Sequence, residues 1–333
     1  MSLRLRPMVQ STAHTRPPRH AAPSRACTAI SIWIAVSAIV FSASRSARGD
    51  LVIVRSSDAV PYKEADAALR EQLSARGEPI RSVLAKELAD GGLAAGIKPS
   101  DCVIAVGTPA ARWLHAQLPD NNRLVYCMVN NPGDAGLLQG RPCWGVTTDV
   151  AIGDQIKLMA EALPRARVIG MLYRSDTTSG KETLKALSAA LPADWRVEAV
   201  AVNDAPSMGA AIESLTEKDI DVIWTSADPG LYDAASVRSL LLAGIRKKIP
   251  VWGFSTAFVR AGALIGVGVE PRSQGAQAAD VLKQLLDDPA SLKERAQSPK
   301  EFQIALNLIV AQQLSVDIPE SLSRRAAFVF RPE

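Results

Sequence analysis

From residue 51 onward, short apolar runs alternate with amphipathic stretches, and this alternation constrains the fold more than any other feature. Runs typical of strands lie at 51–56, 102–107, 123–132, 143–148, 167–175, 195–203, 221–230, 249–255 and 265–271. Stretches with helical periodicity lie at 62–77, 110–118, 152–164, 181–191, 208–219, 234–248 and 275–288, with one more helix expected within 302–316. Strands that alternate with helices predict an α/β fold with parallel sheets and crossover helices.

The pattern starts again at residue 152, and the two halves of the chain resemble each other loosely. DCVIAVGTP (101–109) and DVIWTSADP (221–229) each contain an Asp, an apolar run, small or polar residues and a Pro. RLVYCMVNNP (123–132) and IPVWGFSTA (249–257) occupy the next place in each half. This correspondence predicts two lobes, each built on a doubly wound parallel sheet.

The N-terminal region differs from the rest of the chain in charge. Residues 1–49 contain seven of the 38 basic residues and no acidic residue. Without these arginines, the chain has fewer basic residues than its 34 acidic ones. The body of the protein therefore lacks the basic surface expected of a nucleic-acid-binding protein, and we expect no nucleic-acid partner.

The same region has the layout of a secretory signal. An apolar run at 28–43 follows several arginines and precedes small residues. This arrangement is typical of a signal peptide, here residues 1–49, with cleavage expected after Ser44 or after Gly49. Retention of the segment as a membrane anchor remains an alternative.

Export would place the three remaining cysteines, Cys102, Cys127 and Cys143, in an oxidising compartment. Three thiols form at most one intramolecular bridge. Cys127 and Cys143 lie in neighbouring strand-like runs and are the best candidates for a disulfide. The alternative is three buried, inert thiols.

Motifs of catalysis are missing from the sequence. After residue 49 the only histidine is His115, which lies within an expected helix. A metal site built on several histidines is excluded, and so is a Ser–His–acid triad unless His115 serves as its base. The sequence has no G-x-S-x-G, CxxC, P-loop or G-x-G-x-x-G pattern. We therefore predict no catalytic residue, no bound metal and no cofactor.

Small polar residues follow the predicted strands at six turns. These turns lie at 56–58, 107–109, 130–132, 173–176, 226–229 and 254–256. In open parallel sheets, ligands bind beyond the carboxyl ends of the strands. A single such turn is often only a helix cap, but six turns on one rim favour a ligand site. A ligand carboxylate would favour the helix start at Thr108, and an ammonium group would favour Asp228 or Asp176. Trp224 and Trp252 are expected in the core.

Several segments resemble a known family in the order in which they occur. They are VIAVGTPAA (103–111), VYCMVNNPGDAGLL (125–138), GVTTDVAIGDQIKLMAEALPRARVIGMLY (145–173), IPVWGFSTAFVRAGALIGVGVEPRSQGAQAADVLKQLL (249–286) and LNLIVAQQLSVDIPESLSRRA (306–326). The chain resembles the periplasmic substrate-binding proteins of an ABC-transporter group that includes tryptophan- and tyrosine-binding lipoproteins.

The resemblance implies the type I periplasmic-binding fold, in which two lobes joined by a multi-strand hinge close on a ligand. The crossings between lobes are expected near 147–151, 269–272 and 289–300. Lobe 1 would then contain 50–148 plus 272–289, and lobe 2 would contain 149–271 plus 290–333.

The rim and the resemblance together give a set of candidate ligand-binding residues. They are Ser57, Asp58, Gly107, Thr108, Pro109, Asn130, Asn131, Tyr173, Ser175, Asp176, Thr178, Asp228, Phe254 and Ser255. The sequence departs from the family in two ways. It has no lipobox cysteine, which implies a protein free in the periplasm. It also has YRSDTTSG (173–180) where relatives often carry an asparagine- and serine-rich turn.

The function implied is that of an exported, periplasmic solute-binding protein, not an enzyme. It would be a monomer that delivers a small polar or amino-acid-like ligand to an ABC permease in the inner membrane. Two alternatives remain. The same clamp could sense a ligand and signal to a membrane receptor or kinase, or rim carboxylates could serve an enzyme of the cell envelope.

Overall fold

The computed structural model describes residues 49–92, 96–228 and 230–332. It contains two β-sheets, as the alternation of strands and helices predicts. The first sheet is made of β1 (Leu51–Arg55), β2 (Ile80–Leu84), β3 (Cys102–Val106), β4 (Arg123–Val129), β5 (Trp144–Thr147) and β11 (Ala296–Gln297). Its strand order is β11-β5-β4-β3-β1-β2, and all of its pairs are parallel.

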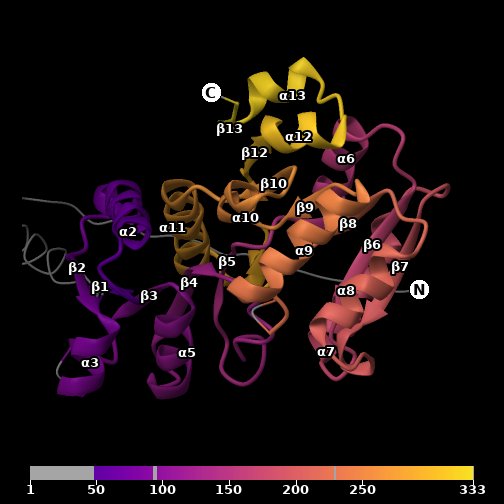
Figure 1. The fold of residues 1–333 in the computed structure, drawn as a ribbon. Coiled ribbons are helices and arrows are strands. Elements are labelled where there is room, and N and C mark those ends of the chain that lie inside the picture. Colours follow the sequence, from indigo (N-terminus) through magenta and orange to yellow (C-terminus); the bar gives the residue numbers. More distant parts are fainter. Residues whose placement is uncertain (1–48, 93–95, 229, 333) are drawn as a thin grey trace, which may run out of the picture. The chain divides into compact units, whose positions relative to one another are not determined.

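Helices cover both faces of this sheet (Figure 1). They are α2 (Val60–Leu73) and α11 (Pro271–Asp287) on one face, and α3 (Ala85–Gly91) and α5 (Thr108–Gln117) on the other. Alternate residues of β3 point to opposite faces: Ile104 packs with α2 and α11, whereas Val103 packs with α3 and α5. A strand covered on both faces is apolar throughout, which explains the continuous apolar run at 102–107.

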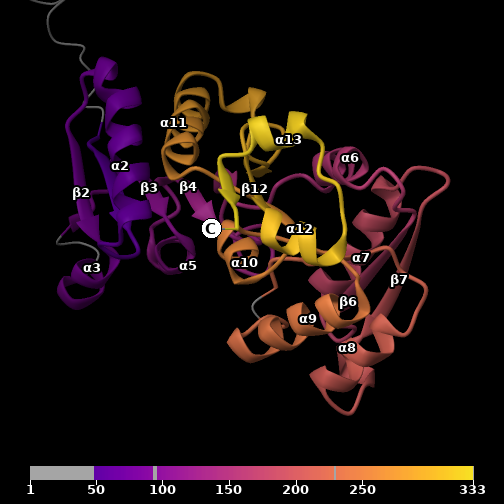
Figure 2. The ribbon, with the colours of Figure 1, turned by 45° about the horizontal axis from the view of Figure 1, so that its top comes forward.

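The helices α2 and α11 lie side by side although they are far apart in the sequence (Figures 1 and 2). Gly275 of α11 permits this approach, because a Cβ atom there would lie 2.2 Å from the carbonyl oxygen of Ala65. The late segment 271–287 therefore belongs to the core of the first sheet.

The second sheet has the strand order β13-β12-β10-β9-β8-β6-β7. Its strands are β6 (Val168–Tyr173), β7 (Arg196–Ala201), β8 (Val222–Trp224), β9 (Val251–Gly253), β10 (Ile265–Gly268), β12 (Gln303–Asn307) and β13 (Phe328–Phe330). All of its pairs are parallel except β10 with β12.

Two groups of helices pack on the opposite faces of this sheet. One group is α6 (Ile152–Ala162), α7 (Thr178–Ala190), α12 (Leu308–Leu314) and α13 (Glu320–Arg325), and the other is α8 (Met208–Thr216), α9 (Ala234–Lys247) and α10 (Thr256–Ala261). Short 3-10 helices lie at Ser74–Arg76, Val202–Asp204 and Pro289–Ser291. The fold is thus two α/β lobes, each with a sheet between helical layers.

Within the described residues, the chain passes between the two sheets at three places. Residues 148–151 lead from β5 to α6, residues 269–270 lead from β10 to α11, and residues 298–302 lead from β11 to β12. The first two lie within the expected crossings, and the third lies at the end of the expected 289–300. Because β11 pairs with β5, residues 296–297 belong to the first sheet. The proposed residue limits of the lobes remain a prediction.

The segment 302–316 contains the expected helix, but only in its second part. It begins as strand β12 and becomes helical only at Leu308. A short apolar run is compatible with a buried strand or a buried helix, so periodicity alone does not separate the two. Asn307 ends the strand and caps α12, because its side chain accepts a hydrogen bond from the Val310 backbone amide at 3.1 Å.

The disulfide between Cys127 and Cys143 is not present; both residues, like Cys102, are buried free thiols. Cys127 packs on the face covered by α2 and α11, and Cys143 packs on the opposite face. Two side chains on opposite faces of a sheet cannot form a disulfide. The prediction failed because neighbouring strands in the sequence do not tell which face each cysteine is on. Burial raises the pKa of Cys127 to about 12 and that of Cys143 to about 11, which keeps both thiols protonated and unreactive.

Within the described residues, no helix is long and apolar enough to cross a membrane. The apolar run at 28–43 that predicts a signal peptide lies outside the described part of the chain.

Candidate ligand-binding site

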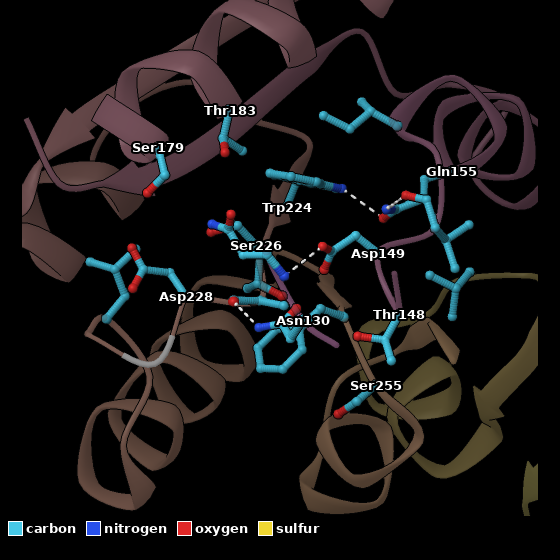
Figure 3. Close-up of a pocket in the computed structure, with 18 of the residues that line it drawn as sticks. Asn130, Thr148, Asp149, Gln155, Ser179, Thr183, Trp224, Ser226, Asp228 and Ser255 are labelled. Carbon is cyan, nitrogen blue, oxygen red and sulfur yellow. Dashed lines mark hydrogen bonds between the residues drawn. The ribbon is translucent and has the colours of Figure 1, made fainter. Parts of the chain in front are cut away.

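A cavity of about 660 Å³ lies where strands of both sheets end (Figure 3). The first sheet contributes the loop after β4, with Asn130 and Asn131, and the segment after β5, with Thr148 and Asp149. The second sheet contributes the ends of β6, β8, β9 and β10, and α7 adds one helical wall. This position agrees with the rule that ligands of parallel α/β sheets bind at the carboxyl ends of strands.

The structure brings only part of the predicted residue set to this cavity. Those that line it are Asn130, Asn131, Tyr173, Asp228, Phe254 and Ser255. Those that do not are Ser57, Asp58, Gly107, Thr108, Pro109, Ser175, Asp176 and Thr178. Ser226 and Thr256, which lie in predicted turns, also line it. Asp58 is exposed beside β1, where a hydrogen bond from Arg55 lowers the pKa of its carboxyl.

The helix start at Thr108 is already occupied by protein groups. Ser56 Oγ accepts a hydrogen bond from the Ala110 backbone amide at 3.0 Å and donates one to the Val106 carbonyl at 3.0 Å. Thr108 Oγ1 accepts a hydrogen bond from the Asn130 backbone amide at 3.3 Å. Because Ser56 supplies the cap, the turn at 107–109 joins strand to helix, and Thr108 and Pro109 line a separate, more open hollow.

The turn before α7 is also used by the fold. Thr177 caps α7 by accepting a hydrogen bond from the Gly180 amide at 3.1 Å, and the Ser175 amide donates to Asn203 Oδ1 at 3.1 Å. The cavity is lined instead by Ser179 and Thr183, one turn apart on α7. Their spacing of four residues places them on one helical face, a signal that strand-end reasoning does not use.

Asp228 lines the cavity, but its charge is already compensated. Its Oδ2 accepts a hydrogen bond from Arg174 Nε at 3.0 Å, and its Oδ1 accepts one from the Gly230 amide at 2.8 Å. The carboxylate and the guanidinium form a partly buried ion pair at the edge of the cavity. A ligand ammonium would have to compete with Arg174 for this carboxylate.

Trp224 is buried, as expected, but it also forms part of the cavity wall. Gln155 fixes its orientation: Gln155 Oε1 accepts hydrogen bonds from Trp224 Nε1 at 3.1 Å and from Trp252 Nε1 at 3.0 Å. Gln155 Nε2 donates to the Val150 carbonyl at 2.8 Å. With its indole nitrogen satisfied inside the protein, Trp224 presents an apolar surface to the cavity (Figure 3).

Asp149 was not among the predicted residues, and it lies in the crossing segment after β5. Its Oδ2 accepts hydrogen bonds from the Asn131 amide at 2.8 Å and from Thr147 Oγ1 at 2.6 Å. Burial raises the pKa of the Asp149 carboxyl, and these two hydrogen bonds lower it in part. The signal for this residue was a carboxylate directly after a strand, in the sequence Thr147-Thr148-Asp149.

Two hydrogen bonds join the loop after β4 to elements of the second sheet at this cavity. Asn130 Nδ2 donates to the Ala227 carbonyl at 2.8 Å, and Ser179 Oγ donates to Asp134 Oδ2 at 2.8 Å. Asp134 Oδ2 also accepts from Asn131 Nδ2 at 2.9 Å, which holds the loop in shape. We call these two bonds between lobes, Asn130–Ala227 and Ser179–Asp134, the interlobe contacts.

The ring of His115 contacts the protein backbone: its Nε2 lies 3.2 Å from the Arg141 carbonyl oxygen. Among the described residues, no group of three or more His, Cys, Asp or Glu side chains is arranged to hold a metal ion.

Comparison with known proteins agrees with this architecture. The family described as ABC transporter substrate binding protein matches residues 94–330. A search of curated proteins gave no match. A ligand-free, open substrate binding protein with adhesive properties from Clostridium difficile is similar in structure, with a TM-score of 0.64 and 18% identity over 85% of this chain and 100% of its own.

Two other solved structures share the fold. An ABC domain in complex with L-Trp from Streptococcus pneumonia has a TM-score of 0.55 and 20% identity over 84% of this chain and 100% of its own. An arabinose binding protein from Geobacillus stearothermophilus has a TM-score of 0.52 and 11% identity over 81% of this chain and 99% of its own.

Two parallel-sheet lobes, three crossings and a cavity at the strand ends define the type I periplasmic-binding architecture. The chain belongs to the family of ABC transporter substrate binding proteins. Family and fold are those of non-enzymatic binding proteins.

Proposed function

We propose that this protein binds one small polar or amino-acid-like solute in the cavity between its lobes and delivers it to an ABC permease. The observation that carries the proposal is the cavity itself, which both sheets line and which the interlobe contacts border. Its volume of about 660 Å³ lies within the range typical of small-molecule sites. Apolar walls with a few polar groups are suited to orient such a ligand.

The class of ligand is part of the proposal. One solved structure with a related fold is in complex with L-Trp, and another is named an arabinose binding protein. Similarity of fold therefore does not distinguish an amino-acid ligand from a sugar. The wall formed by Trp224, Tyr173 and Phe254 favours a solute with an apolar or aromatic body. The hydroxyls of Thr183, Ser226 and Ser255 would bind its polar end.

Export and a monomeric state complete the proposal. Proteins of this family are typically extracellular or periplasmic. The basic, apolar and small-residue succession within 1–49 supports secretion and removal of this segment. The partner would be a permease in the inner membrane, which would recognise the ligand-bound, closed form.

A thermal-shift screen of amino acids, amines and sugars, on protein recovered from a periplasmic extract, tests this function. A ligand that binds only the folded state raises the unfolding temperature by mass action, and ligand at 1,000 times Kd adds about 4 kcal/mol. We expect compounds of one chemical class to raise the unfolding temperature, and calorimetry to show that one molecule binds per chain. We also expect the mass of the mature protein to correspond to a chain that begins at Arg45 or Asp50. A screen in which no compound stabilises the protein would contradict the proposal.

A further inference from the structure

We infer that Asp149 is the anionic subsite of the cavity and binds a cationic amine of the ligand. The ligand class would then be amines and amino acids with an apolar or aromatic body, and not neutral sugars or simple carboxylates. This inference rests on the proposed function and makes it more specific.

The position of Asp149 is the first argument. It lies in residues 148–151, which cross from the first sheet to the second, and it lines the cavity (Figure 3). Its carboxylate has one oxygen engaged and one oxygen available. Oδ2 accepts both hydrogen bonds from the protein, from the Asn131 amide and from Thr147 Oγ1. Within the described residues, no hydrogen bond reaches Oδ1.

Missing charge compensation is the second argument. No Lys, Arg or His of the described residues forms an ion pair with Asp149. Its nearby charge is another carboxylate, that of Asp134. The other carboxylates of the cavity differ: Asp228 is paired with Arg174, and Glu182 is exposed on α7. Among the described residues of the cavity, Asp149 is thus the half-buried carboxylate that has no cationic partner.

The uncompensated carboxylate of Asp149 favours a ligand that brings a positive charge and hydrogen-bond donors. A half-buried carboxylate without a cation is unfavourable, and the partial loss of water accordingly raises the pKa of Asp149. An ammonium group placed at Oδ1 would supply both the charge and the hydrogen-bond donors that the protein does not. A neutral sugar hydroxyl would supply only a donor, and a ligand carboxylate would add repulsion. The cavity therefore discriminates in favour of cationic or zwitterionic solutes.

The apolar walls define the rest of the ligand. Trp224, Val267 and Val269 line the same cavity, and Gln155 holds the Trp224 ring in place. A solute whose amine binds Asp149 can therefore place an apolar body against this wall. The two features together describe an aliphatic or aromatic amino compound.

The test uses the isosteric variant Asp149→Asn. The asparagine oxygen can accept the hydrogen bonds from Asn131 and Thr147, so the variant removes the charge and keeps the contacts. Asp154→Asn is the matched control, because Asp154 is an exposed residue of the following helix, paired only with Lys157. The probes are the proteinogenic amino acids, simple amines and D-arabinose, and each amine that binds is compared with its deaminated carboxylate.

We expect amines to bind the wild-type protein and their deaminated partners not to bind. Asp149→Asn should weaken binding of the amine at least about 30-fold, as expected for loss of one partner of a desolvated charge pair. Asp154→Asn should retain wild-type affinity. The inference is overturned if the bound probe is D-arabinose or a carboxylate, or if Asp149→Asn binds the amine as tightly as the wild type. If no probe binds the wild-type protein, the proposed function itself fails.

The stability of the ligand-free variant gives a second, independent readout. A carboxyl whose pKa is raised by folding loses stability as pH rises above its unfolded value of 3.8, because the unfolded state then binds fewer protons. Asp149→Asn should therefore unfold about 1–3 °C higher than the wild type at pH 7, with the difference vanishing toward pH 3.8. The substitution leaves the other charged groups around the cavity unchanged; these are Asp134, Glu182 and the Arg174–Asp228 pair. If the variant unfolds at a lower temperature than the wild type, the Asp149 charge stabilises the fold, and the inference is contradicted.

Discussion

At the scale of single residues, Gly107 shows how the end of β3 is built. It has a φ of +97°, which L-residues with a side chain rarely adopt. A Cβ atom there would lie 2.5 Å from Ser56 Oγ and 2.9 Å from the Tyr62 ring. The glycine lets Ser56 reach the first amides of α5, and this contact closes the helix start that a ligand would otherwise use.

Substitution Gly107→Ala is therefore expected to lower the free energy of unfolding by about 2–4 kcal/mol, from backbone strain together with displacement of the Ser56 cap. Gly136→Ala is the matched control, since Gly136 also has a positive φ of +75° but nothing within 4 Å of an added Cβ. It should cost only about 1–2 kcal/mol, the strain alone. Urea denaturation of the two variants measures the difference, and equal losses would show that the contact with Ser56 contributes nothing.

Individual site residues were predictable only in part. Asn130 and Asp228 follow strands whose ends meet at the cavity, so topology alone predicts their position. The ion pair of Asp228 was not predictable, because its partner Arg174 lies 54 residues earlier in the chain. Likewise, the sequence contains Ser56 and Ala110, but only their contact in space shows that the helix start is capped.

At the scale of elements, the loop after β4 and helix α7 border the cavity from opposite sheets. The Ser179–Asp134 hydrogen bond joins them and is exposed, with Asp134 at the surface and Ser179 half-buried. An exposed hydrogen bond adds little to global stability, but a bond that joins two lobes favours the arrangement in which its partners meet.

Ser179→Ala should leave the free energy of unfolding within about 0.5 kcal/mol of the wild type and shift the ligand-free protein toward open forms by about two- to fivefold. Ser188→Ala is the matched control on the same helix, where the hydroxyl donates only to the Leu184 carbonyl of α7. Distances between spin labels on the two lobes measure the shift. An unchanged distance distribution in Ser179→Ala would show that this contact does not hold the lobes together.

Elements were predicted well where their sequence patterns are distinct. The strand–helix alternation from 51 to 288 follows from buried parallel strands and amphipathic helices, which differ in period and length. Strand β12 was missed because Gln303–Asn307 continues directly into the apolar helix α12 with no Gly or Pro between them. Helix α7 was predicted, but its role as a cavity wall depends on which of its faces meets the sheet.

At the scale of the whole molecule, the part of the chain that the structure describes forms two sheets connected by three crossings, and the cavity lies at the strand ends. The internal similarity of 101–109 and 221–229 predicted this duplication. The sequence could not predict which of six rim turns enter the cavity, because that depends on how the two sheets face each other. The crossing segment that carries Asp149 is part of the connection between lobes and of the site at once.

The central claim is that the cavity between the lobes holds one small solute. Native mass spectrometry of protein purified without denaturation, compared with the variant Thr183→Trp, tests it most directly. Thr183 lines the cavity from α7, so an indole there fills the space, whereas Lys185→Trp places the same group on an exposed position of the same helix. We predict a single small-molecule adduct on the wild type and on Lys185→Trp, and its loss in Thr183→Trp. An adduct that persists in Thr183→Trp would contradict the claim by placing the ligand elsewhere.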